Sequence, residues 1–263
     1  MTFRLLFIGD VMGEVGCAAV LALVPDLRRE LGLDAVVANA ENSAPTGRGI
    51  TPESASGLLS VVDFLTLGNH AFDVEGSEKF LEREPRVIRP VNLEAGSPGY
   101  GSGTFKAGNV RVGVVNVQGR VFMKQTPSSP FRAADRVVGE LEAAGADFVL
   151  VDVHAEATSE KQAIGYHLAG RAQAVIGTHT HVPTADARIL SGGTAYVTDV
   201  GMTGGAESII GFDKEEFLGL FLGRGPSHLG ASKAPANLNA VVVGVEVESR
   251  QAVSIERVLR EGV

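Results

Sequence analysis

Cysteine and tryptophan are almost missing from this chain of 263 residues, which has one cysteine and no tryptophan. A single cysteine cannot form an intrachain disulfide, and it excludes a metal site built only of thiolates. Cys17 lies in a stretch rich in Ala, Val and Leu, which is typical of a small buried side chain. Because a chain without disulfides fits a reducing compartment, we expect the protein in the cytoplasm.

Positive charge is also scarce. The chain has 23 Lys and Arg residues against 31 Asp and Glu residues, a formal net charge of -8. This balance argues against non-specific nucleic-acid binding, which depends on a positive field around the protein. No apolar run is long enough to span a bilayer, so we expect no membrane partner. A small phosphate ester is still compatible with the charge, because bound metal ions would supply positive charge locally.

The length is sufficient for one large α/β domain, and we expect residues 1–263 to form a single domain. Glycine is abundant, which suits many tight transitions from strand to loop. In the first half of the chain, short apolar runs rich in β-branched residues are mostly separated by helical patterns, as in repeated βα units. The expected strands are Leu5 to Ile8, Ala35 to Ala38, Phe64 to Leu67, Val110 to Val117, Phe148 to Val153 and Ala174 to Ile176.

Helical patterns lie between these runs. The expected helices are Leu21 to Leu31 with a pattern that begins after Pro25, one whose first turn holds Pro52, Ala133 to Ala144, and one from Thr158 to near Gly170. After Ile176 the pattern changes to short strands separated by turn residues, which predicts a second, more antiparallel sheet. Those strands are expected at Thr194 to Val200, Phe217 to Leu222, Val241 to Val247 and Ala252 to Val258.

Side chains of the kinds that bind metals follow five of the predicted strands. In an open α/β sheet the loops at the carboxyl ends of the strands face one crevice, so donors that are distant in sequence can converge there. The donors at these strand ends are Asp10, Glu41, Asn42, Asn69, His70, His154, His179 and His181.

Each donor also has a plain structural explanation when it is taken alone. Asp10 could cap a helix, Asn42 could be a turn residue, and two histidines in a Thr-rich loop could simply be solvated. His179 and His181 stand at i and i+2, which in an extended segment places both rings on one side, for one metal or for two neighbouring ones. All of these donors follow apolar strands, and this shared position favours a common site.

The donor types indicate which metals and which chemistry this site would support. Cleavage of a phosphate ester by water needs an activated hydroxide and compensation of phosphoryl charge, and two divalent ions about 4 Å apart supply both. Imidazole suits Mn, Fe and Zn, whereas carboxylate and amide oxygens are harder donors. The mixture favours Fe or Mn, with Mg or Zn as alternatives, and a small phosphate ester as the substrate.

The donors and their order resemble the signature of the calcineurin-like metallophosphoesterases. That signature consists of Gly-Asp, Gly-Asn-His, a strand-end His and Gly-x-His-x-His, found here at residues 9–10, 68–70, 154 and 177–181. More closely, the chain resembles the YmdB-type phosphodiesterases of bacteria. The segments that carry this resemblance are 9–13 (Gly-Asp-Val-Met-Gly), 39–42 (Asn-Ala-Glu-Asn), 47–51 (Gly-Arg-Gly-Ile-Thr), 154–161 (His-Ala-Glu-Ala-Thr-Ser-Glu-Lys) and 198–203 (Thr-Asp-Val-Gly-Met-Thr).

The resemblance implies a four-layer α/β/β/α sandwich of two mixed sheets flanked by helices, with a dinuclear site near the sheet edges. It implies that Glu41 bridges the metals, with a hydroxide between them as nucleophile. It also implies that His70 is the general acid or oxyanion stabiliser for the leaving oxygen. One implied ligand set is Asp10, Asn42 and His181, and the other is Asn69, His154 and His179.

The chain departs from the pattern of these families at three places. Residues 10–12 read Asp-Val-Met instead of Asp-x-His, and Glu41 stands where the superfamily has a bridging Asp. If Asn42 replaces the missing imidazole, its oxygen should shift the first site toward harder ions. Gly205 and Ala206 stand where the closer family has Pro-Tyr, so we expect a different substrate fit there.

The function implied by the resemblance is hydrolysis of small cyclic nucleotides, from 2′,3′-cyclic nucleotides to 3′-monophosphates. Two alternatives remain open: a phosphomonoesterase or nucleotidase that uses the same metals, and a metal-binding regulatory protein with little turnover. The oligomeric state cannot be read from the sequence, although aliphatic surface patches could support a homo-oligomer.

Several further residues are candidates for supporting roles. Arg48, in a Gly-Arg-Gly loop, could contact a substrate phosphate or could be a solvated turn residue. His167 and His228 do not follow strand ends, and we expect them to be structural or solvated. A histidine ligand normally donates its second ring N–H to a carboxylate or carbonyl. Nearby carboxylates that could accept it are Asp73, Glu156 and Asp199.

Overall fold

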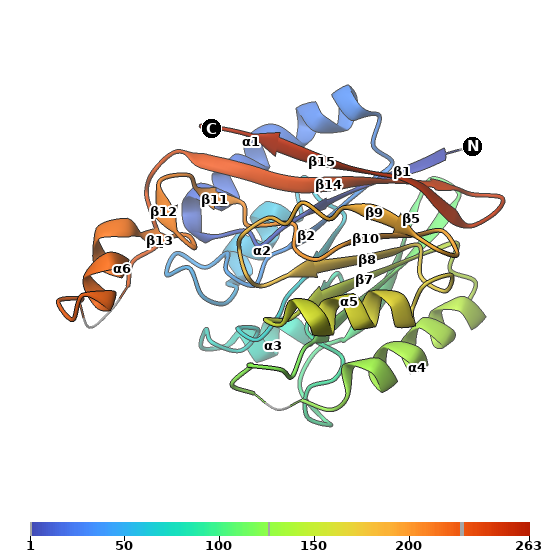
Figure 1. Ribbon diagram of the computed structural model, residues 1–263, viewed down its shortest axis with the longest axis horizontal. Helices are drawn as coiled ribbons and strands as arrows, with labels where there is room; N and C mark the ends of the chain where they lie inside the picture. Colours follow the sequence, from blue (N-terminus) through green and yellow to red (C-terminus); the bar gives the residue numbers. More distant parts are fainter. Residues whose placement is uncertain (1, 126, 227–228) are drawn as a thin grey trace.

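Two β-sheets stacked face to face form the middle of the molecule, in a computed structural model that describes residues 2–125, 127–226 and 229–263 (Figure 1). The first sheet has the order β11-β14-β1-β2-β3-β4, with β15 paired to β14. Its strands are β1 (Thr2–Ile8), β2 (Ala35–Asn39), β3 (Phe64–Thr66), β4 (Val87–Ile88), β11 (Gly204–Gly205), β14 (Ala236–Glu246) and β15 (Gln251–Arg260). Strands β1 to β4 are parallel, and β14 runs antiparallel to β1.

The second sheet has the order β5-β6-β7-β8-β10-β9. Its four central strands are parallel, and the two edge strands are antiparallel to their neighbours. The strands are β5 (Ser102–Ala107), β6 (Val110–Gln118), β7 (Phe148–His154), β8 (Ala174–Thr178), β9 (Arg188–Leu190) and β10 (Thr194–Val197).

Helices cover the outer faces of both sheets. Figure 1 shows α1 against the first sheet and α4 and α5 against the second. The helices are α1 (Gly13–Leu31), α2 (Pro52–Leu58), α3 (Ser77–Leu81), α4 (Pro130–Ala143), α5 (Thr158–His167) and α6 (Lys214–Phe221). Among the described residues, none of these helices is both long and apolar enough to cross a bilayer.

The alternation of side chains along the strands explains why there are four layers. On β1, Leu5 points into an apolar core shared with Phe148 of β7, whereas its neighbour Leu6 packs with Val20 and Val24 of α1. A third core joins the outer face of the second sheet to α4 and α5. The predicted α/β/β/α sandwich is confirmed.

The expected second, antiparallel sheet in the C-terminal part is wrong. Strands β14 and β15 are at the predicted positions, but β14 pairs with β1 in the first sheet, and β10 pairs with β8 in the second. The C-terminal strands therefore complete both sheets. Hydrophobic periodicity indicates a strand, but it does not indicate which strand is the partner.

Two helices also differ from their predictions. The strand expected at Phe217 to Leu222 is instead the end of α6. The residue before this helix, Asp213, caps it, and its side chain accepts hydrogen bonds from the Glu215 and Glu216 backbone. A short apolar run alone suits a strand or a helix, and the capping carboxylate of Asp213 favours the helix. Helix α1 begins at Gly13, and Pro25 lies inside it, because burial of its apolar face outweighs one lost backbone hydrogen bond.

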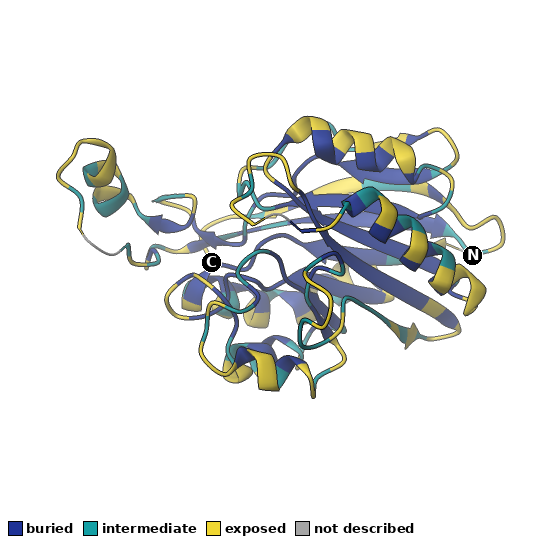
Figure 2. Ribbon diagram, turned by 90° about the horizontal axis from the view of Figure 1, so that it is seen from below, coloured by how far each residue is buried: buried dark blue, intermediate teal, exposed yellow. Residues whose placement is uncertain are grey.

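Residues 208–226 extend from the body of the molecule and are mostly exposed (Figure 2), and we call them the projecting segment. It contains a short hairpin of β12 (Ser208–Ile209) and β13 (Phe212–Asp213), followed by α6. The base of this segment lies beside the predicted donors, because the Ile210 carbonyl accepts a hydrogen bond from His181.

Candidate metal centre

The carboxyl ends of the parallel strands in both sheets meet at one edge of the sandwich. Asn39 at the end of β2 donates a hydrogen bond of 2.9 Å to Asp152 of β7, which links the two sheets at this edge. The loops that leave β1, β2 and β3 carry Asp10, Glu41 and Asn69, and the second sheet contributes its donors at the ends of β7 and β8. The structure therefore brings together the predicted donors, as strand ends in an α/β fold predict.

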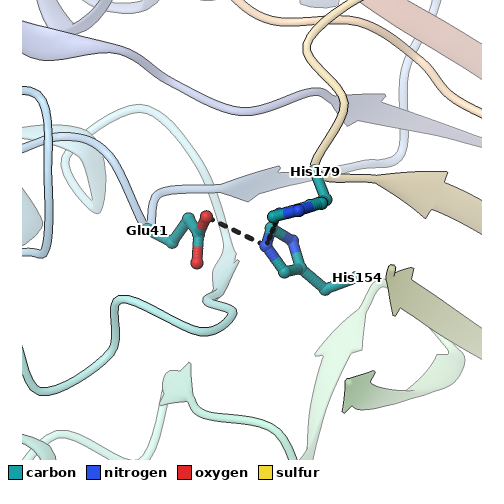
Figure 3. Close-up of side chains that lie close together, drawn as sticks. All are labelled: Glu41, His154 and His179. Atoms are coloured by element: carbon teal, nitrogen blue, oxygen red, sulfur yellow. Dashed lines mark hydrogen bonds and ion pairs between the residues drawn. The ribbon is translucent and has the colours of Figure 1, made fainter. Parts of the chain in front are cut away.

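The centre of the site is the Nε2 atom of His154, which is fully buried. It lies 2.9 Å from Glu41 Oε1, 3.1 Å from Asn69 Oδ1 and 3.0 Å from His179 Nδ1. Figure 3 shows the rings of His154 and His179 and the Glu41 carboxylate pointing toward one another. Because one ring nitrogen carries at most one proton, His154 Nε2 cannot donate a hydrogen bond to all three partners. The lone pairs of these atoms therefore converge on one small volume. This is the arrangement expected of ligands that share a cation.

The electrostatics of this group favour positive charge at its centre. Burial alone would lower the pKa of His154, but the carboxylates of Glu41 and Asp10 outweigh it and raise the pKa to about 9. Burial would raise the pKa of Glu41, but His154 lowers it to about 2. For His179, burial and the neighbouring His154 both lower the pKa, to about 3. The buried carboxylate thus draws a cation into the site.

A buried relay fixes the orientation of the His154 ring. Its Nδ1 lies 2.9 Å from the hydroxyl oxygen of Thr178, which donates to Asp152 Oδ1 at 2.7 Å. Because the Thr178 proton goes to Asp152, the hydroxyl oxygen accepts from His154 Nδ1, and Nε2 faces the other donors. Asp152 is not among the residues predicted from the sequence, although a carboxylate between Val151 and Val153 in an apolar strand is a signal for a buried polar role.

A second group of donors lies beside the first. Asp10 is fully buried, and its Oδ2 accepts from the His179 backbone N–H at 3.2 Å, whereas Oδ1 has no hydrogen-bond partner among the described residues. Burial outweighs the attraction of His181 and His154 and raises the pKa of Asp10 to about 6. A buried carboxylate oxygen without a hydrogen bond costs free energy unless a cation compensates it, so this oxygen fits a metal ligand.

His181 and Asn42 complete the second group. His181 Nδ1 donates to the Ile210 carbonyl at 2.8 Å, which leaves Nε2 directed toward Asn42 Nδ2, 3.1 Å away. The Asn42 nitrogen also lies 3.4 Å from Glu41 Oε1. An amide ligand coordinates through oxygen, so ligation by Asn42 requires its amide to be turned over.

His70 lies at the entrance to the donor cluster and is partly exposed. Its Nδ1 is 2.6 Å from Asp73 Oδ2, and its backbone N–H donates to Glu41 Oε2 at 3.1 Å. Asp73 was expected beside a histidine ligand, and it instead pairs with His70, the predicted general acid. Glu156 lies against a predicted ligand, with Oε2 3.3 Å from His179 Nε2.

The prediction for Asp199 is wrong in its partner. Asp199 accepts no ring N–H from the residues that the structure describes. Its Oδ2 accepts from the backbone and hydroxyl of Thr180 at 3.1 and 2.7 Å and from Lys161 Nζ at 2.7 Å. His179 and His181, on either side of Thr180, have φ angles of 95° and 65°. Residues other than glycine rarely adopt this left-handed region. Asp199 thus holds the strained turn that carries both histidines, and Lys161 holds Asp199.

Two other residues considered in the sequence, His167 and Cys17, are not among the donors. His167 is exposed and pairs with Asp135 at 2.9 Å, as expected of a structural or solvated side chain, whereas His228 lies outside the described residues. Cys17, expected to be a small buried side chain, is partly buried in α1. Burial, followed by the charge of Glu14, raises its thiol pKa to about 12, which disfavours the reactive thiolate.

The donors open onto a cleft of about 350 Å³. Gly205 and Ala206 are not part of its lining, so the departure from Pro-Tyr does not act through direct contact with this cleft. The lining residues are Glu41, Asn42, Arg48, His70, Glu156, His179, Thr180, His181, Ile210 and Phe212.

The two-sheet sandwich with this donor cluster defines a metallophosphoesterase fold. A 5′-nucleotidase precursor from Thermus thermophilus shares it with a TM-score of 0.63 at 14% identity, over 98% of this chain and 54% of that one. The model of the YmdB-like protein family matches residues 6–258. The chain belongs to the YmdB-like family.

Individual relatives are similar over almost their whole length. The chain is 41% identical to the 2′,3′-cyclic-nucleotide 2′-phosphodiesterase of Bacillus subtilis over 97% of this chain and 96% of the relative. It is 31% identical to a putative phosphatase/phosphodiesterase of Mycoplasma pneumoniae, over 98% and 92%. A crystal structure of a hypothetical protein from Thermus thermophilus matches with a TM-score of 0.91 and 45% identity, over 99% and 100%.

Proposed function

We propose that this protein is a metal-dependent phosphodiesterase that hydrolyses 2′,3′-cyclic nucleotides to 3′-monophosphates. The observation that carries the proposal is the convergence of Glu41, Asn69 and His179 on His154 Nε2, each within 3.1 Å, beside an Asp10 oxygen that has no hydrogen bond among the described residues. The Bacillus subtilis relative, whose name gives this activity, supports the choice of substrate.

Two divalent ions would be held by the two groups of donors. Asn69, His154 and His179 would bind one ion, and Asp10, Asn42 and His181 the other. Glu41 would bridge them, because its Oε1 lies beside both groups, 2.9 Å from His154 Nε2 and 3.4 Å from Asn42 Nδ2. When bound, the ions would activate the attacking water and offset charge on the phosphoryl oxygens. The mixture of imidazole and oxygen donors favours Fe or Mn over Mg or Zn.

His70 would act on the leaving oxygen. A water oxygen attacks phosphorus and the water gives up a proton to solvent. The bond from phosphorus to the ribose O2′ breaks, and O2′ takes a proton. The Asp73 carboxylate fixes the His70 ring through Nδ1, which leaves Nε2 to deliver that proton as general acid. His70 also holds the Glu41 carboxylate through its backbone, so the proposed acid and the proposed bridge are rigidly connected.

The cleft and the charge of the chain fit a small substrate. A volume of about 350 Å³ is near the lower end of typical ligand pockets, which span about 300 to 1,000 Å³. The net charge of -8 argues against a nucleic-acid polymer. With one cysteine, the chain also fits a cytoplasmic location, and a homo-oligomer is compatible with it.

The proposal is tested by stripping the purified protein of metal, reloading it with Mn and following hydrolysis of 2′,3′-cyclic AMP with identification of the product. We expect turnover that yields 3′-AMP and collapses in His70→Ala. His167→Ala is the matched control, because it removes a histidine paired with a carboxylate at 2.9 Å but away from the site.

The two alternative functions predict other results. A strong preference for monoesters over the cyclic diester would indicate a phosphomonoesterase or nucleotidase. Tight metal binding without turnover, together with a cellular effect of the protein that His70→Ala leaves unchanged, would indicate a metal-binding regulatory protein.

A further inference from the structure

Arg48 is a cation at the mouth of the donor cleft without an anionic partner. Among the residues that line this cleft in the described part of the chain, it is the only Lys or Arg. Its backbone carbonyl accepts from the Thr46 hydroxyl at 3.2 Å, and no carboxylate of the described residues pairs with its guanidinium. Other lining side chains are engaged: Glu156 lies against His179, and Glu41 against His154.

The loop that carries Arg48 has one well-defined conformation. Both flanking residues are glycines in the left-handed region, Gly47 with φ 77° and Gly49 with φ 81°. A Cβ atom on Gly47 would lie 2.5 Å from Met12 Cε, and one on Gly49 would lie 2.7 Å from Val74 Cγ2. Backbone hydrogen bonds from Gly47 to Ala44 and from Ala44 to Gly49, of 2.8 and 2.9 Å, close the loop. Arg48 is therefore presented by a preorganised turn.

The side chain of Arg48 is held by the base of the projecting segment. Its Cζ lies 5.6 Å from the centroid of the Phe212 ring, within the range of a cation–π contact. Phe212 is 6% exposed and stands two residues after Ile210, whose carbonyl orients His181. The segment that orients one proposed metal ligand thus also positions this cation.

We propose that Arg48 binds the phosphate of the substrate, donating guanidinium N–H groups to its two non-bridging oxygens. This proposal rests on the proposed function, since it places a phosphate ester in the cleft. The ring of Phe212 covers part of the guanidinium and leaves its donor edges for an anion, and a planar guanidinium suits two phosphate oxygens better than a lysine ammonium does. In an acidic chain, a cation kept free of carboxylates at this position has an anionic ligand as its natural partner.

The test compares Arg48→Gln and Arg48→Lys with the wild-type protein, all loaded with Mn. Two diesters are used, 2′,3′-cyclic AMP and bis(4-nitrophenyl) phosphate, which lacks ribose and base. We expect Arg48→Gln to raise KM for both by about tenfold or more, with little change in kcat, because a charge-assisted hydrogen bond to the bound substrate is lost. The KM values of Arg48→Lys should lie between those of the wild type and Arg48→Gln, because lysine keeps the charge but loses the paired N–H donors of the guanidinium.

Arg188→Gln is the matched control. Its guanidinium also lies over aromatic rings, 5.7 Å from the Tyr196 centroid and 6.0 Å from that of Tyr166, but Arg188 does not line the cleft. This control changes the net charge of the protein by the same amount as Arg48→Gln. Because Arg188 lies outside the cleft, the KM values of Arg188→Gln should equal those of the wild type.

Three results would overturn the assignment: unchanged KM values in Arg48→Gln, a rise for the cyclic nucleotide alone, which would place the base against Arg48, or a fall in kcat alone. If the wild type turns over neither diester, the proposed function fails, and titration calorimetry of inorganic phosphate into the Mn-loaded protein still tests Arg48. Weaker phosphate binding in Arg48→Gln than in Arg188→Gln would then support the phosphate contact, and equal binding would refute it.

Discussion

Lys161 Nζ lies 2.7 Å from Asp199 Oδ2, and both side chains are almost completely buried. The same carboxylate oxygen accepts from the backbone and the hydroxyl of Thr180, between the two histidines of the candidate site. Helix α5 is thereby connected through one ion pair to the turn that bears His179 and His181. The geometry of the site depends on residues that do not touch it.

Replacement of Lys161 by methionine should destabilise the protein by about 3 to 5 kcal/mol, because Asp199 would remain buried without its counter-ion. Urea unfolding would measure the loss. Lys106→Met is the control, since Lys106 is exposed on β5. A difference below about 1 kcal/mol between the two variants would contradict a structural role for the ion pair.

Loss of Glu41 should reduce metal retention more than loss of Asn42. Glu41 supplies a buried charge that contacts His154, the His70 backbone and Asn42, whereas Asn42 supplies only a neutral amide. Elemental analysis of Glu41→Ala and Asn42→Ala after dialysis would give the metal content per chain. Equal contents in the two variants would show that Glu41 does not serve as a bridge.

Thr178→Val should weaken metal binding by roughly 10- to 100-fold, because outer-shell partners orient the ligating ring. The substitution keeps the shape of the side chain and removes the hydroxyl between His154 and Asp152. Competition with a chromogenic chelator would measure the affinity for Mn. Thr104→Val, on an exposed position of β5, is the control. Unchanged affinity in Thr178→Val would mean that the relay does not position His154.

Cys17 should react slowly with thiol reagents in the folded protein. Its pKa is raised to about 12 by burial and by Glu14, against an ordinary value of 9.0, so near pH 8 the folded state holds roughly a thousandfold less thiolate than the unfolded state. Alkylation by iodoacetamide should be slow at pH 8, should accelerate as the pH rises toward 12, and should be fast in urea. Equal rates in the folded and unfolded protein at pH 8 would contradict the burial of this thiol.

The donors of the site could be predicted because each one follows an apolar strand, and strand ends of an α/β fold meet at one edge. Sequence patterns could not predict that β14 joins β1, because strand pairing depends on tertiary contacts. They also missed the roles of Asp152 and Lys161, whose partners are distant in the chain, and gave Asp199 the wrong partner. That residues 1–263 form one domain, and that the donors bind two metals, stay predictions.

Titration of Mn into the stripped protein, with simultaneous measurement of 2′,3′-cyclic AMP hydrolysis, tests the central claim most directly. The proposed dinuclear site predicts that turnover rises until two equivalents of Mn are bound per chain and that 3′-AMP accumulates. Full activity at one equivalent would contradict a dinuclear site. The absence of hydrolysis with two equivalents bound would contradict the proposed phosphodiesterase activity.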